Sequence, residues 1–184
     1  MIKTITKGNI LIAKPVSYDH NFDQSVIVLT DHGENGSVGF IQNKPTDYKV
    51  RDLLKELNCD YTVFNGGPVE KENIYYFHSR SDLISNSIEI YSGLFWSGDF
   101  KDVTYAINHG LIEEHEIRFF LGYSGWSKGQ LNLELENDSW YILNKNIALT
   151  SFKKGEYSVW QKMLKIMGGN YLLWINTPFD PTLN

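Results

Sequence analysis

Hydrophobic residues in this chain occur mostly in short runs separated by turn-forming residues, which is the pattern of a β-rich protein. Many of the runs contain Val, Ile, Tyr or Phe, the residues that favour strands. We predict strands at residues 9–13, 25–29, 37–41, 62–64, 74–77, 87–91, 117–121 and 140–143. The second and third runs are joined by a short loop of Gly and Asn and predict a hairpin. Pro45 is predicted to end the third run, because proline has no N–H to donate to a neighbouring strand.

The spacing of hydrophobic residues changes to that of a helix in three stretches. Residues 47–58 predict an amphipathic helix, because their apolar side chains follow the i, i+3, i+4, i+7 rule. Asp99 is a good N-cap for a second helix, which Gly110 is placed to end. Residues 157–167 predict a third helix, ended by the glycine pair at 168–169.

The stretch at residues 122–136 predicts a fourth helix and its entry. It follows the apolar run at 117–121 and begins with a group of glycines. Ser127 and Gln130 have the spacing of a capping box, in which the two side chains satisfy backbone N–H groups at the helix start. Trp126 and Leu131 have the spacing of a hydrophobic staple. The whole segment therefore predicts a strand, a glycine turn and a capped helix.

The order of these elements indicates the fold class. Strands and helices are interspersed without a regular βαβ alternation, and the chain has no internal repeat, low-complexity segment or long linker. This order favours a mixed or largely antiparallel sheet over a doubly wound parallel sheet. We expect an α/β protein of the α+β type, with one domain over residues 1–184. Its mixed, largely antiparallel β core is flanked by about four helices.

Composition narrows the class of protein. The 184 residues carry a formal charge of −5, which argues mildly against electrostatic binding of nucleic acid. The basic residues between Lys44 and Lys55 form the best local group, but their positions suit a solvated helix face equally well. The single cysteine, Cys59, excludes an internal disulfide and fits a reducing compartment. No apolar run approaches the roughly 18 residues of a membrane span, so we expect a cytoplasmic protein.

The glycine clusters are the first candidates for a ligand site. Gly122, Gly125 and Gly129 match neither the dinucleotide fingerprint nor the phosphate-binding loop, so turn and packing roles are favoured. Ser124 lacks the last glycine of a nucleophile elbow. The cluster at residues 65–68, Asn-Gly-Gly-Pro, is interpreted as a tight turn or, alternatively, as a loop whose amides line a cleft.

Two groups of His, Asp and Glu residues are candidates for a metal site. They are His109, Glu113, Glu114, His115 and Glu116 in one group, and Asp19, His20 and Asp23 in the other. Neither group has the i, i+4 histidine pair or the closed four-ligand set of a zinc site. Solvated loop and turn residues are the favoured interpretation, and no metal or cofactor is predicted.

Several of these stretches together resemble one known family. They include Gly-Asn-Ile-Leu-Ile-Ala-Lys-Pro at 8–15 and Gly-Tyr-Ser-Gly-Trp-Ser-Lys-Gly-Gln-Leu at 122–131. The others are Asp19, Phe22, residues 25–29, 36–45, 65–69 and 74–78, Glu134 and Trp140. In this order and spacing they resemble the bacterial AlgH/YqgE family. Ser124 stands where the family pattern has Ala, and residues from Gly168 onward depart from it.

The resemblance implies a single α/β domain with a β-rich core flanked by helices. It also carries the label of transcriptional regulator, derived from a member linked to alginate regulation, and it implies no catalytic residue. The favoured function is a non-enzymatic cytoplasmic domain that binds a protein partner or a small ligand. The alternatives are direct DNA binding as a regulator and an undescribed hydrolase or transferase activity. The candidate binding residues are Asn65, Gly66, Gly67, Pro68, Gly125, Trp126, Gly129 and Gln130.

Overall fold

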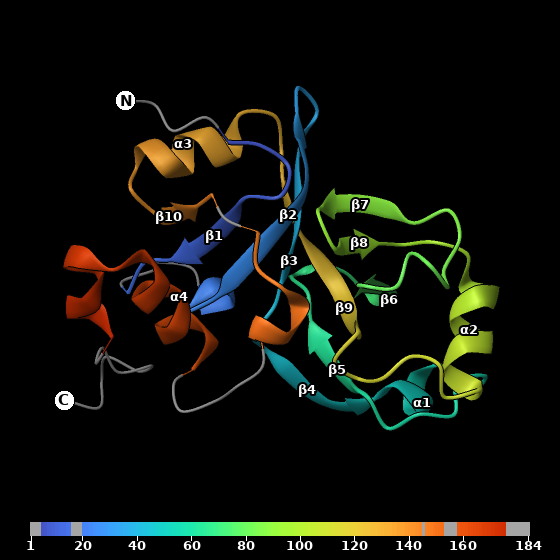
Figure 1. Cartoon of the computed structure of the whole chain (residues 1–184). Coiled ribbons are helices and arrows are strands. Elements are labelled where there is room, and N and C mark those ends of the chain that lie inside the picture. Colours follow the sequence, from blue (N-terminus) through green and yellow to red (C-terminus); the bar gives the residue numbers. More distant parts are fainter. Residues whose placement is uncertain (1–4, 16–19, 145, 153–157, 176–184) are drawn as a thin grey trace.

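One long strand, β9 (Ile117–Trp126), is the common partner of both halves of the sheet (Figure 1). The structure is a computed structural model and describes residues 5–15, 20–144, 146–152 and 158–175. The other strands are β1 (Ile10–Ala13), β2 (Val26–Gly33), β3 (Gly36–Ile41), β4 (Pro45–Lys49), β5 (Thr62–Asn65), β6 (Val69–His78), β7 (Ile88–Tyr91), β8 (Leu94–Trp96) and β10 (Trp140–Leu143). The helices of the described residues are α1 (Val50–Leu53), α2 (Phe100–Asn108), α3 (Gln130–Glu136), α4 (Val159–Met167) and the short 3-10 helices η1 (His20–Phe22), η2 (Leu149–Phe152) and η3 (Gly169–Trp174).

The two edges of β9 are used differently. Along one edge β9 pairs antiparallel with β6, where Tyr76 lies opposite Phe119. Along the other edge its first half pairs parallel with β5, and its second half pairs antiparallel with β3. The β5–β9 pair is the one parallel pair among the described strands. The sheet is therefore mixed and largely antiparallel, as the sequence predicts.

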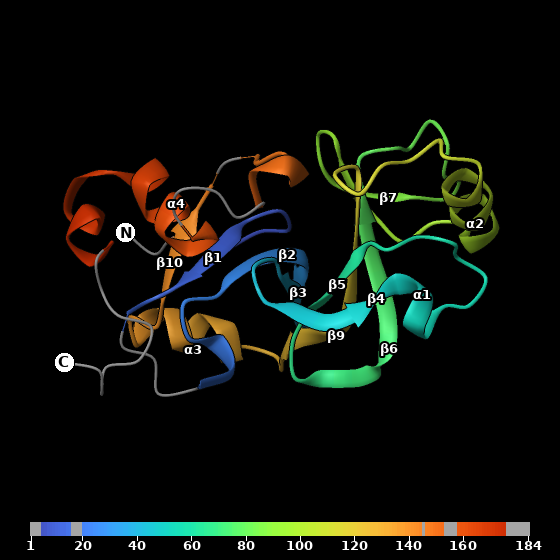
Figure 2. The same ribbon diagram turned by 90° about the horizontal axis from the view of Figure 1, so that it is seen from below.

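Alternation along β1 explains how two helices pack on opposite faces of the sheet. All four residues of β1 are buried, because both faces of this strand are covered. Ile10 and Ile12 pack in the apolar cluster that contains α4, where Trp160 is completely buried. Leu11 and Ala13 pack in the cluster that contains α3. Figure 2 shows α3 and α4 on the two sides of β1 and β2.

Helix α2 covers the other half of the sheet, as its sequence pattern predicts. The carboxylate of Asp99 accepts a hydrogen bond from the N–H of Lys101 at 2.9 Å, which confirms the predicted N-cap. Val103, Ala106 and Ile107 are buried in a cluster with residues of β5, β6 and β9. Burial of this apolar stripe, rather than helix propensity alone, holds a helix of this length in place.

The predicted helix at 47–58 is wrong over most of its length. Pro45–Lys49 is a strand, and α1 spans only Val50–Leu53 before Leu54 takes an extended conformation. Pro45 begins a strand instead of ending one, which is tolerated because β4 lies at an edge and pairs only with β5. Val50 and Leu57 are both buried, so their apolar spacing reflects tertiary packing and not a continuous helix.

The predicted glycine turn after residue 121 is also wrong. Strand β9 continues to Trp126, and Gly122 allows this by taking a φ of +66° within the strand. Helix α3 begins at Gln130 with Gly129 as its N-cap, two residues later than Ser127 would place it. Trp126 and Leu131 still lie in one apolar cluster, but with Gly129 as N-cap they do not hold the positions of the predicted hydrophobic staple.

Candidate functional site

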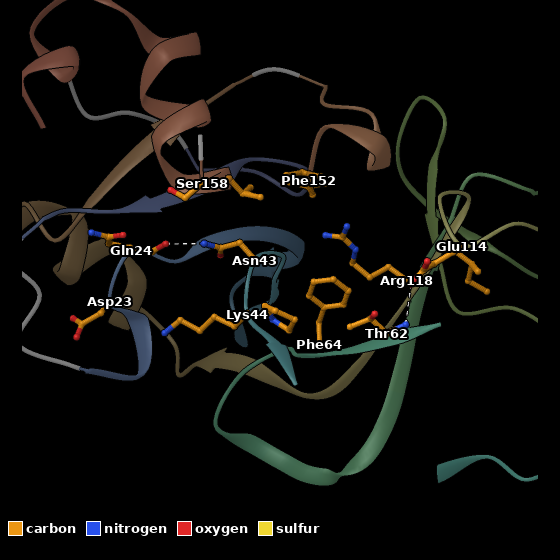
Figure 3. Close-up of a pocket in the computed structure, with 13 residues that line it drawn as sticks. Asp23, Gln24, Asn43, Lys44, Thr62, Phe64, Glu114, Arg118, Phe152 and Ser158 are labelled. Atoms are coloured by element: carbon orange, nitrogen blue, oxygen red, sulfur yellow. Dashed lines mark hydrogen bonds between the residues drawn. The ribbon is translucent and has the colours of Figure 1, made fainter. Parts of the chain in front are cut away.

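A pocket of about 700 Å³ opens where the start of β9 meets β5 and the first turn of α4 (Figure 3). This volume lies within the range of small-molecule sites, which is about 300–1,000 Å³. The described residues that line the pocket come from segments far apart in the sequence. They are Asp23, Gln24, Asn43, Lys44, Pro45, Thr62, Phe64, Glu114, Ile117, Arg118, Phe152, Ser158 and Val159.

Arg118 is the distinctive residue of this pocket. Its side chain extends from β9 between Phe64 and Phe152, and the residue is only 7% exposed (Figure 3). The guanidinium carbon lies 4.2 Å from the ring centre of Phe64 and 6.0 Å from that of Phe152. Such contacts between a cation and aromatic faces are favourable, and more so when the cation is desolvated.

Strand alternation places Arg118 on this face of the sheet. Ile117 and Phe119 belong to the apolar cluster under α2, whereas Phe120 belongs to the cluster under α4. Successive side chains of a strand point to opposite faces, so Arg118 lies on the same face as Phe120. An arginine within the apolar run 117–121 is thus directed into the space beside α4.

The charge of Arg118 is only partly compensated. Its Nη1 donates a hydrogen bond to the carbonyl oxygen of Gln42 at 2.6 Å. Within the described ranges, no carboxylate forms an ion pair with it, and no acceptor is found for its Nε or Nη2. Burial lowers the pKa of Arg118 to about 10, while the charge of Glu114 opposes this shift. The guanidinium is therefore still a cation at neutral pH, and several of its N–H groups are left for a ligand.

Hydrogen bonds hold the polar side of the pocket in place. The side chain of Asn43 accepts from the N–H of Val26 at 2.9 Å and donates to the carbonyl oxygen of Gln24 at 2.8 Å. The N–H of Thr62 donates to the carboxylate of Glu114 at 3.0 Å (Figure 3). A wall fixed in this way loses little conformational entropy when a ligand binds.

The first turn of α4 closes the pocket opposite Phe64. Ser158 is the N-cap, its hydroxyl accepts from the N–H of Gln161 at 3.2 Å, and the Gln161 side chain accepts from the N–H of Ser158 at 2.9 Å. Ser158 and Val159 both line the pocket, so the positive end of the α4 dipole faces the same space as Arg118. Both features favour an anion there.

Comparison with known proteins gives the family. The family model described as AlgH-like, DUF179, matches residues 10–172. The chain belongs to the AlgH-like family. Curated relatives are named UPF0301 proteins: that of Cytophaga hutchinsonii is 40% identical over 183 residues, covering 98% of this chain and all of the relative. That of Chlorobium luteolum is 39% identical over 184 residues, covering 99% of this chain and 96% of the relative.

Solved structures agree with this AlgH-like assignment. The solution structure of the AlgH protein from Pseudomonas aeruginosa is 28% identical with a TM-score of 0.68, and the match covers 94% of each chain. A crystal structure of a Corynebacterium diphtheriae protein is 20% identical with a TM-score of 0.78. That match covers 96% of this chain and 94% of the other, and it supports the fold. The resemblance read from the sequence is confirmed, as is the single α/β domain with a mostly antiparallel sheet.

In this AlgH-like chain the two glycine segments lie against each other. A Cβ atom on Gly67 would stand 2.2 Å from the carbonyl carbon of Tyr123, and one on Gly66 would stand 2.3 Å from the carbonyl oxygen of Gly122. These contacts join backbone to backbone, so the two glycines permit close packing of the 65–68 segment on β9. The Asn65 side chain accepts from the N–H of Gly67 at 3.0 Å, and Pro68 is exposed.

The predicted residues at 125–130 lie apart from the Arg118 pocket. Gly125 and Trp126 line a separate hollow of about 510 Å³ beside the β2–β3 hairpin. Gln130 donates to the carboxylate of Glu134 at 3.0 Å, and Gly129 has open space around it. Ser124 is completely buried and its hydroxyl donates to the carbonyl oxygen of Gly66 at 3.1 Å. Whether these predicted residues bind a ligand stays a prediction.

Glu134 explains why tryptophans accompany this glycine-rich segment. One of its oxygens accepts from the indole N–H of Trp126 at 2.9 Å and from that of Trp140 at 2.8 Å. Phe22 packs against both indole rings. One carboxylate of α3 thus ties the end of β9 to the start of β10, and Phe22 of η1 packs on the two tryptophans that it holds.

Members of the first candidate metal group, which the sequence favours as solvated loop residues, make other contacts in the structure. His115 lies 3.1 Å from the carboxylate of Glu113, and Glu116 pairs with Arg80 at 3.1 Å. Among the described residues, no three His, Cys, Asp or Glu side chains converge as a metal site. No helix in the part of the chain that the structure describes is long and apolar enough to cross a bilayer. Asp19 lies outside the described residues.

Proposed function

We propose that this AlgH-like chain is a non-enzymatic binding domain whose pocket beside Arg118 takes a small anionic molecule. The observation that carries the proposal is the buried guanidinium of Arg118, which has one hydrogen-bond partner and no carboxylate partner among the described residues. Burying a charge without a partner is costly, so an anion that enters the pocket gains a strong interaction.

The rest of the pocket supports binding over catalysis. Its described lining residues include no histidine or cysteine, and the hydroxyl of Ser158 is used as a helix cap. The carboxylate of Glu114 accepts from a backbone N–H, and Asp23 lies 3.0 Å from His20 at the exposed rim. A reaction would need a nucleophile and a base close to one another inside the pocket.

The local charge balance indicates how the ligand is attracted. Arg118 and Lys44 are offset by Asp23 and Glu114, so the lining as a whole has little net charge. We therefore expect weak long-range attraction and modest dependence of affinity on salt. The affinity would come from short-range contacts with Arg118 and the aromatic walls.

Isothermal titration calorimetry tests the proposal with two anions of matched shape, naphthoate and naphthyl phosphate. We expect at least one to bind the wild-type protein and to lose affinity in the variant Arg118→Met. The control is Lys128→Met, which removes an exposed cation that does not line the pocket. If neither anion binds, or if both variants bind as the wild type does, the proposed site is wrong.

Direct DNA binding, which the family label suggests, is the alternative function. Two basic residues of the predicted basic face already have partners: Arg51 pairs with Asp60 at 2.7 Å, and Lys49 donates to Thr62 at 3.2 Å. We expect no binding to a labelled random-sequence duplex in fluorescence anisotropy, even at low salt. Binding that weakens steeply as salt rises would support the DNA-binding alternative instead.

A further inference from the structure

The way Arg118 is held determines the chemistry of the anion that fits beside it. We infer that the ligand of this pocket is a flat apolar carboxylate, whose two oxygens meet the Nε–Nη2 edge of Arg118. This inference rests on the proposed function and specifies its ligand. It follows from three features: the free edge of the guanidinium, the two aromatic rings beside it, and the other apolar residues that line the pocket.

The free edge of Arg118 has the geometry of a carboxylate. Nη1 is occupied by the carbonyl oxygen of Gln42 at 2.6 Å, whereas Nε and Nη2 have no acceptor among the described residues. The N–H groups of Nε and Nη2 are parallel and lie on one side of the guanidinium. Two parallel N–H groups match the two oxygens of a carboxylate in one plane.

The aromatic rings restrict the direction of approach. The guanidinium carbon lies 4.2 Å from the centre of the Phe64 ring and 6.0 Å from that of Phe152, so the two rings narrow the space beside it. A planar group fits this narrowed space. A tetrahedral phosphate is bulkier and would bring a further charged oxygen into a space that these apolar rings border.

The remaining oxygens of a phosphate would need other donors. The second cation of the described lining is Lys44, and its ammonium already donates to the carbonyl oxygen of Asn21 at 2.7 Å. The N-terminus of α4 is the feature that most favours phosphate. However, Ser158 and Gln161 already satisfy two of its N–H groups. The Nε and Nη2 N–H groups of Arg118 are sufficient to bind both oxygens of a carboxylate.

The body of the ligand would lie on apolar side chains. Five lining residues are apolar: Pro45, Phe64, Ile117, Phe152 and Val159. Phe64 and Phe152 place aromatic surface next to the guanidinium, so a flat ring attached to the carboxylate would meet aromatic side chains in the pocket. Offset contacts between aromatic rings favour such a body over a flexible chain.

Calorimetry with three ligands of the same shape tests the inference: naphthoate, naphthyl phosphate and naphthalenemethanol, all substituted at the same ring position. We expect naphthoate to bind wild-type protein more tightly than naphthyl phosphate, and the neutral alcohol to bind at least about tenfold more weakly than naphthoate. The variant Arg118→Lys keeps the charge but has no fork of N–H groups, so we expect naphthoate affinity to fall about tenfold or more. Lys128→Met should leave it unchanged.

Nuclear magnetic resonance reports directly on the Nε–Nη2 edge of Arg118. The chain has three arginines, Arg51, Arg80 and Arg118, so its arginine Nε–H resonances are few and can be assigned with Arg118→Lys. Bidentate binding of naphthoate should shift the Arg118 resonance and leave the other two in place. A merely structural effect of the substitution would not produce this shift in wild-type protein.

The outcomes separate the inference from the function on which it rests. Tighter binding of naphthyl phosphate than naphthoate, lost in Arg118→Met, would overturn the carboxylate assignment and keep the anion site. Equal binding of naphthalenemethanol would overturn both. If neither naphthoate nor naphthyl phosphate binds, the proposed function itself is rejected. Naphthoate binding without a shift of the Arg118 resonance would place the ligand elsewhere.

Discussion

Removing the Glu134 carboxylate should destabilise the fold far more than removing its neighbour on the same helix. Glu134 is half-buried and accepts hydrogen bonds from Trp126, Trp140 and Gln130. In Glu134→Leu, the two indole N–H groups keep their buried positions and lose their acceptor. Trp126 is 5% exposed and Trp140 is 6% exposed, so water has little access to the indole N–H groups and cannot easily replace the lost carboxylate as their acceptor.

The size of the effect follows from these two donors. A buried donor left without a partner costs about 1–3 kcal/mol, so two of them give a loss of about 2–6 kcal/mol in the free energy of unfolding. In Glu134→Gln, the amide oxygen can still accept from the indoles. That variant should lose only the charge-assisted part of the two bonds, about 1–2 kcal/mol.

Urea denaturation followed by far-UV circular dichroism measures these losses. The matched control is Glu136→Leu, since Glu136 is exposed on the same helix, and it should change the free energy of unfolding by less than about 0.5 kcal/mol. We expect the order Glu134→Leu, Glu134→Gln, Glu136→Leu from least to most stable. Equal stabilities of the two leucine variants would refute the idea that the carboxylate holds the tryptophans.

Two further predictions concern a buried histidine and a close backbone contact. Burial lowers the pKa of His78, which is completely buried, while its hydrogen bond with the carbonyl oxygen of Ser97 and the charge of Asp82 oppose this shift. The His78 imidazole therefore binds a proton more readily in the unfolded chain than in the folded protein, so the free energy of unfolding should fall as the pH drops below about 6.5. Urea titrations at several pH values should show a flatter pH dependence in His78→Gln. A profile with the same slope in His78→Gln would contradict this assignment. Gly67→Ala should cost at least about 3 kcal/mol in thermal or urea unfolding, since its Cβ would meet β9 backbone at 2.2 Å. Gly129→Ala, at φ +76° with open space around it, should cost only about 1–2 kcal/mol, and a reversed order would contradict the packing role of Gly67.

The elements that could be predicted from the sequence are those fixed by local pattern. The run at 10–13 is buried on both faces and is a strand, and Asp99 begins α2 as its cap chemistry indicates. The helix predicted at 157–167 is present as Val159–Met167 and ends at Gly168; residue 157 lies outside the described residues. In each case the residues that determine the element are close in sequence, so no distant contact is needed to explain it.

The capping signals show where local pattern stops being sufficient. The spacing Ser-x-x-Gln occurs at 127–130 and again at 158–161. At 158–161 both reciprocal hydrogen bonds form. At 127–130 only the Gln130 side chain bonds back to Ser127, because β9 extends to Trp126 and the helix starts after Gly129. Sheet pairing decides where α3 begins, and pairing cannot be read from these four residues.

The candidate site could not be predicted for a similar reason. Arg118 stands out in the sequence as a cation within an apolar run, and this signal was available. The pocket, however, needs Phe64, Phe152 and Ser158 to meet it, and no spacing in the chain relates these residues. Only the parallel pairing of β5 with β9 and the packing of α4 bring them together.

The position of β9 in the chain has a consequence for biosynthesis. Strands β3, β5 and β6 all pair with β9, yet they leave the ribosome before it does. A nascent chain that ends before residue 117 therefore carries three strands that each lack a partner along the edge that β9 takes in the folded protein. Unpaired strand edges are templates for association with other chains. Until Ile117–Trp126 has emerged, we expect those edges to be the part of the nascent chain most open to association with other chains.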